Sequence, residues 1–199
     1  MRGEADIDRR GEILRQAAAY VLECGLGDLS LRPLAAALGT SGRMLIYYFG
    51  SKDEMVVDIL AEIRRRKYAE LDVRGGDGNA LRRYWDWATS AEGQRYLRVV
   101  YEVYGLSLRE PERYRGFLAT ESQEHLDLIG EGLREAGVAV MYVETLSTYT
   151  FAAMRGLELD LLATGDVGRA DGAFAMFEAD LARRTAEALA RGSRKKERR

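Results

Sequence analysis

The sequence predicts an all-α protein, and three observations support this fold class. Apolar residues recur at spacings of three and four along most of the chain, which is the period of an amphipathic helix. There are only two prolines in 199 residues, and proline is the residue that interrupts helices most strongly. Many of the 21 glycines stand where a helical pattern stops, because glycine adopts the positive φ typical of a helix C-terminus. We expect about nine helices, with a three-helix N-terminal domain before a larger helical C-terminal domain.

The composition excludes several classes of protein. Hydrophobic residues make up 47% of the chain and charged residues 31%, as in a folded domain with a buried core. No apolar run approaches the roughly 18 to 20 residues that span a bilayer, and the acidic N-terminus lacks the apolar stretch of a secretory signal. We therefore expect a cytoplasmic protein without a membrane partner. The single cysteine and single histidine exclude an intramolecular disulfide, a structural zinc site and a Cys/His catalytic pair, and we expect no metal, no cofactor and no enzymatic activity.

The first helix is expected from about residue 8 to residue 24. Its apolar positions share one face and are Ile13, Leu14, Ala17, Val21 and Cys24. Cys24 is expected to be a small core residue, because free cysteines are commonly buried.

A short second helix is predicted over residues 31–38. Ser30 is placed to cap it with its hydroxyl, and Pro33 falls in the first turn, where its missing N–H removes no helical hydrogen bond. Gly39 ends this helix, and Ser41 opens another after a turn of about three residues. Two short helices joined so tightly form a helix-turn-helix.

The third helix, residues 41–49, is predicted to carry a reading face for DNA. Its core-facing positions recur at spacings of three and four, and the positions left to face solvent are Arg43, Met44 and Tyr47. An arginine, a flexible apolar side chain and a phenol suit the major groove, where arginine can bond guanine O6 and N7. The alternative is an ordinary solvent-facing surface on a helical domain that does not bind DNA.

Lys52 stands at the start of a fourth predicted helix. Gly50 suits the end of the third helix, and Ser51 and Glu54 have the spacing of a capping box. The free amides of a first helical turn, together with one lysine, form a clamp for a phosphate group, which fixes register without reading sequence.

Residues 29–54 combine three features: a Leu/Ala-rich helix before Gly39, an aromatic pair at residues 48–49, and Ser51-Lys52 followed by an acid. In this pattern, over roughly residues 9–60, the chain resembles the TetR family of bacterial transcriptional regulators. The resemblance implies a homodimer with an N-terminal DNA-binding domain and a variable, all-helical domain that binds a ligand and dimerises.

The chain departs from the family pattern at three positions. Gly42 and Arg43 stand where the family often has Lys-Gly after the helix-opening serine, and Ile46 replaces the frequent first aromatic of the Tyr-x-Tyr-Phe pattern. Tyr47 is the nearest substitute for the phosphate contact that this aromatic hydroxyl usually makes. The predicted DNA-binding residues are Ser30, Arg32, Thr40, Ser41, Arg43, Met44, Tyr47 and Lys52.

Aromatic residues are concentrated over residues 84–117, where eight occur in 34 residues. Such a density suits a pocket for an apolar or aromatic ligand, and packing in a helical core would give much the same stripe. His125 lies on the next helical pattern, where a structural role is the alternative to ligand contact. The predicted ligand-binding residues are Trp85, Tyr101, Tyr104, Phe117, His125 and Tyr149.

Two late helices carry broad apolar stripes with small residues interspersed. A symmetric four-helix interface between two copies is favoured, because reading two half-sites about 34 Å apart requires a dimer. Burial of these stripes within one subunit is the alternative. The stripes consist of Val143, Leu146, Thr150, Ala153, Met154, Leu157 and Leu161, and of Ala170, Ala173, Phe174, Phe177, Leu181 and Ala188.

We expect a DNA-binding domain at residues 1–52, an effector-binding and dimerisation domain at residues 53–190, and a disordered basic tail at residues 191–199. The predicted function is that of a homodimeric repressor, which a small, largely apolar or aromatic ligand releases from its double-stranded DNA operator. The alternatives are a helical small-molecule-binding protein without DNA activity and an enzyme that uses the aromatic cavity.

Overall fold

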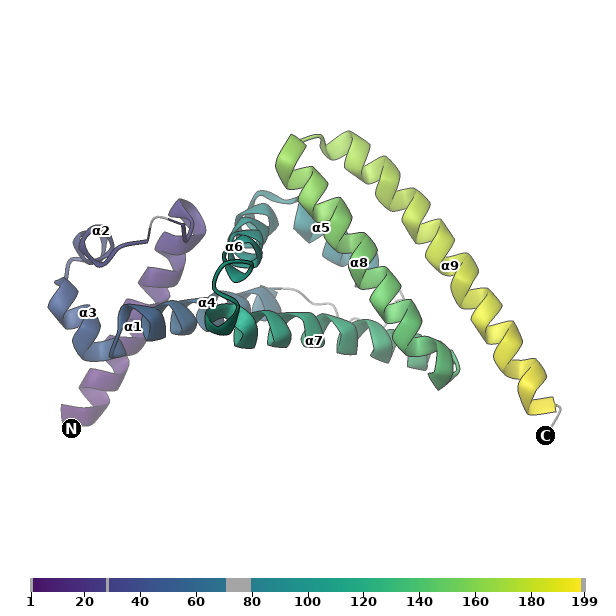
Figure 1. Cartoon of the computed structure of the whole chain (residues 1–199), viewed down its shortest axis with the longest axis horizontal. Helices are drawn as coiled ribbons and strands as arrows, with labels where there is room; N and C mark the ends of the chain where they lie inside the picture. The colour runs from purple at the N-terminus through teal and green to yellow at the C-terminus, as the bar shows by residue number, and fades with distance from the viewer. Residues whose placement is uncertain (1, 28, 71–79, 198–199) are drawn as a thin grey trace. The chain divides into compact units, whose positions relative to one another are not determined.

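A computed structural model describes residues 2–27, 29–70 and 80–197, and these residues form nine α-helices without a strand among them (Figure 1). The predicted all-α fold class is therefore confirmed. Within the described ranges, no helix has the length and apolar composition needed to cross a membrane. The helices are α1 (Arg2–Cys24), α2 (Leu31–Ala37), α3 (Gly42–Phe49), α4 (Lys52–Glu70), α5 (Ala80–Thr89), α6 (Ala91–Ser107), α7 (Pro111–Glu135), α8 (Val140–Thr164) and α9 (Val167–Glu197).

The chain divides into two compact units, Met1–Leu118 and Ala119–Arg199, and the division falls inside α7. The first unit includes α4, α5 and α6 because α1 packs against α4 and α6 as well as α2. The first compact unit is therefore larger than the predicted DNA-binding domain, residues 1–52, because it also contains α4, α5 and α6.

The core of the first unit lies between α1 and α4. Ile13, Ala17 and Val21 line the buried face of α1, and Ile59 and Ile63 line that of α4. The small Ala17 lets the two helices approach closely, and burial of each large aliphatic side chain contributes about 1.5–3 kcal/mol. This core forms the platform on which α2 and α3 are held.

The turn between α2 and α3 is a Schellman motif. Gly39 has φ +62°, and its N–H donates to the Ala36 carbonyl at 3.3 Å, while the Thr40 N–H donates to the Ala35 carbonyl at 2.9 Å. Only glycine adopts this left-handed backbone at no steric cost. The predicted tight connection between the two short helices is therefore present.

Ser30 has the extended backbone of an N-cap, but its hydroxyl makes no capping bond to α2. The expectation of a side-chain cap was wrong. The hydroxyl oxygen of a capping serine accepts a hydrogen bond from the N–H at the second or third helical position, and the third position here is Pro33, which has no N–H to donate.

A second close approach joins α5 and α6. A Cβ built on Gly93 would lie 2.0 Å from the carbonyl oxygen of Trp87, so no larger residue fits there without movement of the backbone. Ser90 caps α6, because its hydroxyl oxygen accepts a hydrogen bond from the Gly93 N–H at 3.0 Å. The side chain of Trp85 is fully buried in the same region.

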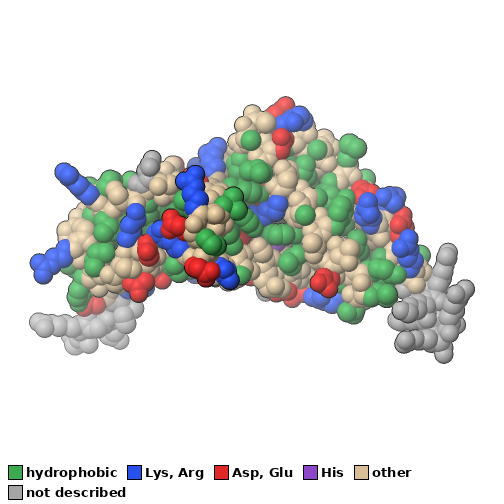
Figure 2. Space-filling view, in the orientation of Figure 1, with side chains coloured by type: hydrophobic (Ala, Val, Ile, Leu, Met, Phe, Trp, Pro, Cys, Tyr) green, Lys and Arg blue, Asp and Glu red, His purple; other side chains and the backbone are tan. Residues whose placement is uncertain are grey.

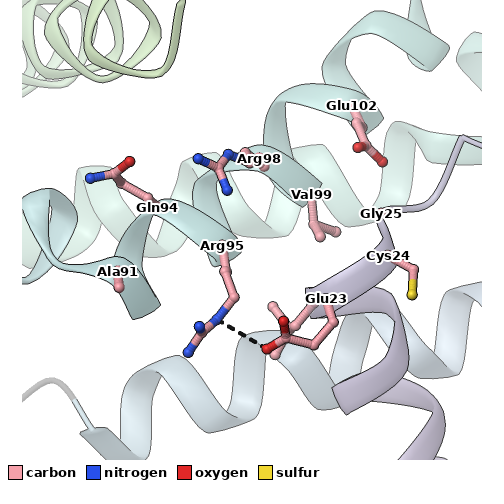
Figure 3. Close-up of a pocket in the computed structure, with 10 residues that line it drawn as sticks. Glu23, Cys24, Gly25, Ala91, Gln94, Arg95, Arg98, Val99 and Glu102 are labelled. Atoms are coloured by element: carbon pink, nitrogen blue, oxygen red, sulfur yellow. Dashed lines mark ion pairs between the residues drawn. The ribbon is translucent and has the colours of Figure 1, made fainter. Parts of the chain in front are cut away.

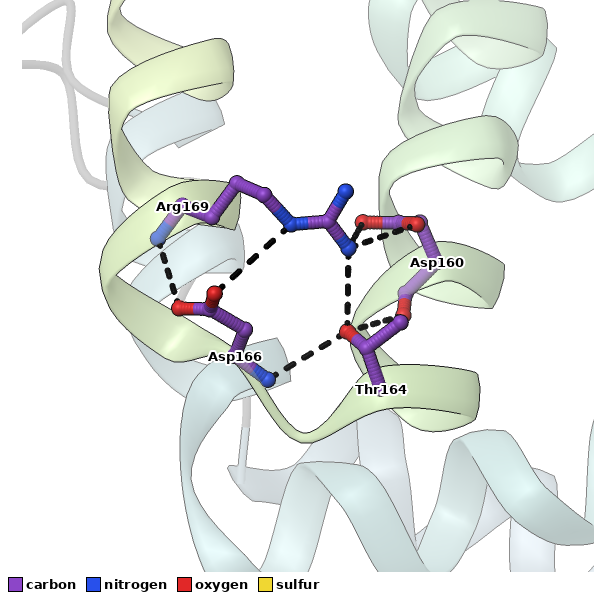
Figure 4. Close-up of polar contacts among 4 residues, drawn as sticks. All are labelled: Asp160, Thr164, Asp166 and Arg169. Carbon is purple, nitrogen blue, oxygen red and sulfur yellow. Dashed lines mark hydrogen bonds and ion pairs between the residues drawn. The ribbon is translucent and has the colours of Figure 1, made fainter.

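In the second unit, α8 and α9 pack against each other and are joined by a turn at Gly165. Arg169 donates to both carboxylate oxygens of Asp160 at 2.9 and 2.7 Å, and its N–H donates to Asp166 at 3.0 Å (Figure 4). The Asp166 N–H in turn donates to the Thr164 hydroxyl at 3.3 Å. These contacts fix the start of α9 against the end of α8.

The apolar stripes predicted for dimerisation are largely buried within this unit. Leu161 and Phe174 are fully buried, and Val143, Leu146 and Ala188 form a second cluster with the end of α7. The alternative of burial within one subunit is therefore correct for most of these positions, because α8 and α9 use them to pack on each other and on α7.

Two further expectations differ from the structure. Cys24 is exposed, because α1 ends at this residue and the core continues through Leu26 and Leu29 in the connection to α2. The predicted disordered tail instead continues α9 as far as Glu197, while residues 198–199 lie outside the described residues. The apolar run at residues 138–143 leads into α8, as expected.

Candidate nucleic-acid interface and ligand-binding residues

α3 presents an apolar face to the core and a mixed face to solvent. Leu45 and Phe49 are buried. Arg43 and Met44 are exposed, and 66% of Tyr47 is accessible to solvent. The helical spacing in the sequence predicts this division correctly, and it leaves an arginine, a thioether and a phenol on one exposed surface.

α3 is held in place by polar contacts at both ends. Ser41 accepts a hydrogen bond from the Met44 N–H at 3.2 Å, which caps the helix. At the other end, Arg10 of α1 donates to the Tyr48 carbonyl at 3.1 Å and pairs with Asp58 of α4. Its guanidinium also lies over the Phe49 ring at 4.9 Å. One arginine therefore ties α1, α3 and α4 together.

Lys52 is exposed and is the first residue of α4, where we expected a phosphate clamp. The Ser51 hydroxyl accepts from the Glu54 N–H at 3.1 Å. The Ser51 N–H donates to the Phe49 carbonyl at 3.0 Å, so only the serine half of the predicted capping box forms.

Three exposed cations lie on this surface or near it in the chain, and none forms an ion pair or hydrogen bond within the described part of the chain: Arg32, Arg43 and Lys52. Figure 2 shows blue side chains projecting from the region of α2 and α3. Cations without an internal partner are available to pair with phosphates. Such pairing would release the counterions condensed on a nucleic acid, which would favour its binding.

The predicted hydroxyl contacts lie beside these cations. Ser30 and Ser41 are exposed, and Thr40 is half-buried in the turn before α3. Because Ser41 uses its oxygen as an acceptor for the cap, its O–H proton stays available as a donor to a phosphate.

The predicted ligand-binding aromatics of the first unit lie on three helices. Trp85 of α5 is fully buried, whereas Tyr101 and Tyr104 of α6 and Phe117 of α7 are half-buried. The Tyr101 and Tyr104 rings pack together with their centres 5.9 Å apart. These two tyrosines are therefore in direct contact.

The two predicted ligand-binding residues of the second unit have structural contacts of their own. His125 Nδ1 lies 2.7 Å from the Glu121 carbonyl oxygen, and its ring packs against Phe151. Tyr149 donates its O–H to Asp180 of α9 at 2.7 Å. Hydrogen bonds from Arg184 and from Tyr149 hold the pKa of Asp180 well below its usual range, and the bond to Asp180 raises the pKa of Tyr149.

Sequence reasoning missed a buried polar cluster between α7 and α8. Glu121 and Glu158 are 0% and 1% exposed, and Arg155 lies 3.6 Å from Glu158 and 4.0 Å from Glu121. The hydroxyls of Ser147 and Thr150 are also buried and make no hydrogen bond in the described residues. The signal for this cluster was a glutamate between Met154 and Leu161 on the apolar face of α8, where a charge needs a partner.

Part of the sequence matches a known family. Residues 13–59 match the family model described as bacterial regulatory proteins of the tetR family. The matched segment begins within α1, includes α2 and α3, and ends within α4. No curated protein sequence matches the chain.

Several solved structures share the whole fold. A TetR-family transcriptional regulator from Rhodococcus sp. is 19% identical and has a TM-score of 0.69, with 86% of this chain and 97% of that chain covered. Salmonella enterica GusR is 19% identical with a TM-score of 0.64, covering 91% and 95%.

NalD of Pseudomonas aeruginosa, the secondary repressor of the MexAB-OprM multidrug efflux pump, is 23% identical with a TM-score of 0.57, covering 90% and 96%. Sequence identities this low show that the fold is shared and give no information on the ligand. Residues 13–59 therefore match the model of the tetR family of bacterial regulatory proteins, and the chain as a whole has the all-helical TetR-like fold.

Proposed function

We propose that this protein is a homodimeric transcriptional repressor that leaves its operator when a small ligand binds. The observation that carries the proposal is α3, a capped and anchored helix whose exposed face bears Arg43, Met44 and Tyr47. The family match over residues 13–59, which includes this helix, supports a role in DNA binding.

The roles follow from chemistry and position. Arg43 would bond guanine O6 and N7 in the major groove, and Met44 and Tyr47 would contact base edges and methyl groups. Lys52 and Arg32 would contact phosphates on either side, with the hydroxyls of Ser30, Thr40 and Ser41 as further phosphate donors. The proposed DNA-binding domain remains residues 1–52.

Dimerisation is supported by the faces of α8 and α9 that the subunit does not bury. Small side chains with one leucine recur there at spacings of three and four, all exposed, and small residues allow helices of two copies to approach closely. On α8 and α9 these positions are Ala152, Gly156, Leu159, Ala163, Gly168, Gly172, Ala175, Ala179, Ala182 and Ala186. A dimer formed through them would present two copies of α3, as two half-sites about 34 Å apart require.

The effector is proposed to be a small, largely apolar or aromatic molecule, bound by residues 53–190. The half-buried rings of Tyr101, Tyr104 and Phe117 and the fully buried Trp85 support an aromatic contact surface. In the second unit, His125 and Tyr149 are separate candidates for a polar ligand contact. A protein that binds chromosomal DNA in this way would act in the cytoplasm, as a regulator and not as a catalyst.

Selection of binding sites from random double-stranded DNA with the purified full chain tests the proposal. A palindromic site with half-sites one helical turn apart is expected, and an electrophoretic shift on that site should disappear when an effector is added. Coupling of about 1–3 kcal/mol, or roughly 5- to 150-fold in operator affinity, is ordinary for such regulators. If no fragment is enriched or shifted at low salt, the chain is instead a helical small-molecule-binding protein without DNA activity.

A further inference from the structure

A cavity of about 510 Å³ lies between the end of α1 and the first three turns of α6 (Figure 3). Its walls come from residues 22–25 of α1 and the connection that follows, and from one face of α6. Ala91, Gln94, Arg95, Arg98 and Glu102 recur on that face at spacings of three and four. All of these residues belong to the first compact unit.

The charged groups of this cavity differ in how firmly they are engaged. Glu102 accepts a hydrogen bond from the Leu26 N–H at 2.5 Å, and its Oε1 lies 2.7 Å from the place that a Cβ on Gly25 would take. Arg95 forms a solvent-exposed ion pair with Glu23, in which Arg95 Nε lies 3.4 Å from Glu23 Oε1. Arg98 makes no ion pair or hydrogen bond within the described part of the chain.

The geometry points to a binding site for a small anion that carries carboxylate or phosphate groups, held by Arg95 and Arg98. The two guanidiniums lie almost one turn apart on the same helix, and Figure 3 shows Arg95 reaching to Glu23 while Arg98 extends beside Gln94. Guanidinium groups pair with carboxylates and phosphates through two parallel hydrogen bonds. The start of α6 adds its partial positive charge to the same side.

The ligand would compete with Glu23 for Arg95. The Arg95–Glu23 pair and the Glu102–Leu26 bond are two polar contacts of α6 with the end of α1 and the connection that follows it. Leu26 and Leu29 follow directly, are buried, and lead into α2. A ligand that takes Arg95 from Glu23 therefore weakens the attachment of α1 to α6, and so changes the preferred position of α1 and α2 relative to α6. This regulatory consequence rests on the proposed function, whereas the binding site itself does not.

Isothermal titration calorimetry tests the site with pyrophosphate and with citrate as probes, at constant ionic strength. At least one probe should bind the full chain with a stoichiometry of one and a Kd below about 1 mM. Arg98→Gln should weaken binding about tenfold or more, and Glu23→Gln should strengthen it a few-fold because the internal competitor is gone. Arg109→Gln is the matched control, since Arg109 is an exposed arginine in the turn after α6, outside the cavity.

Three outcomes overturn the site. Neither probe binds with a Kd below about 1 mM, or Arg98→Gln binds as wild type does, or Lys52→Ala abolishes binding while Arg98→Gln does not, which places the anion on the DNA-binding surface. Backbone amide shifts at residues 23–26 and 94–98 in NMR spectra of the wild-type chain provide the second measurement, and circular dichroism verifies that each variant is folded.

A separate measurement tests the regulatory consequence. The binding probe should change operator affinity at least about threefold in the wild-type chain and leave Arg98→Gln unaffected. If the probe binds but does not change DNA affinity, the anion site is supported and its coupling to DNA binding is refuted. A chain that binds the probe but no DNA refutes the proposed function and leaves the site in place.

Discussion

Individual side chains of the DNA-facing surface have separable roles. Arg43 lies on the exposed face of α3, whereas Lys52 begins α4 beside free helical amides. A guanidinium that reads a base contributes to some sequences only, and a lysine that meets a phosphate contributes to all of them.

Replacing Arg43 by alanine should cost about 1–3 kcal/mol on the selected operator and relax the preference at one base position. Lys52→Ala should weaken binding to operator and scrambled DNA alike and reduce the slope of log K against log salt by about 1. Fluorescence anisotropy at several salt concentrations measures both effects. Equal losses on both DNAs for both variants would contradict the roles assigned here.

At the scale of helices, packing decides which glycines can be replaced. Gly93 meets the Trp87 carbonyl oxygen, so Gly93→Ala should lower the free energy of unfolding by about 1–3 kcal/mol, because the α5–α6 contact must open. Gly105→Ala lies on the same helix, where a Cβ meets nothing within 4 Å. It should raise stability by about 0.5–1 kcal/mol, since glycine is a poor helix former. Urea denaturation of both variants measures the difference, and similar values would show that α6 does not press against α5.

The contact of α4 with α1 should depend on pH through Glu62. Its carboxylate accepts from Arg65 at 2.8 and 2.9 Å and from Arg66 at 3.1 Å, and Arg66 also donates to the Arg15 carbonyl of α1. The bonds from Arg65 are the main reason that the pKa of Glu62 lies below its ordinary value of 4.5.

A lowered pKa means that folding favours the charged carboxylate. The resulting stability is complete above the unfolded pKa, near 4.5, and is lost as pH falls through the lower folded pKa. Glu62→Gln should therefore destabilise the protein by about 1 kcal/mol at pH 7 and by much less at pH 3. Urea titrations across this range measure it, with Glu112→Gln as an exposed control. A difference that does not shrink in acid would exclude this pairing as the cause.

For the whole molecule, the exposed small-residue faces of α8 and α9 determine assembly in the proposed dimer. Ala179→Glu would place a charge where two copies approach and should shift the protein to monomers, with loss of affinity for the two-half-site operator. Ala61→Glu, on an exposed position of α4, should leave the dimer intact. Analytical ultracentrifugation distinguishes these outcomes, and a wild-type chain that sediments as a monomer would refute the interface.

The sequence was most informative where local rules decide the structure. Helix order, the Gly39 turn, the Ser41 cap and the exposure of Arg43 follow from spacing and backbone chemistry within a few residues. The failed Ser30 cap was also local, because the proline at the third helical position was visible in the sequence.

Tertiary features were beyond this reasoning. Cys24 continues an apolar stripe, and its exposure depends on where the partner helices end. To predict the cavity beside α6, one must know which face of α6 turns toward α1, and the spacing of residues in the sequence does not show this. Arg155 and Glu158 interrupt an apolar pattern, but the partner Glu121 lies more than thirty residues away in the chain.

The exposed Cys24 has a practical consequence. It is the only thiol in the chain, so a nitroxide reagent would attach at a single position without any mutation. In the proposed dimer, the two attached spins would form a molecular ruler between the DNA-binding halves. Pulsed electron paramagnetic resonance could then follow their separation in the free, operator-bound and effector-bound states.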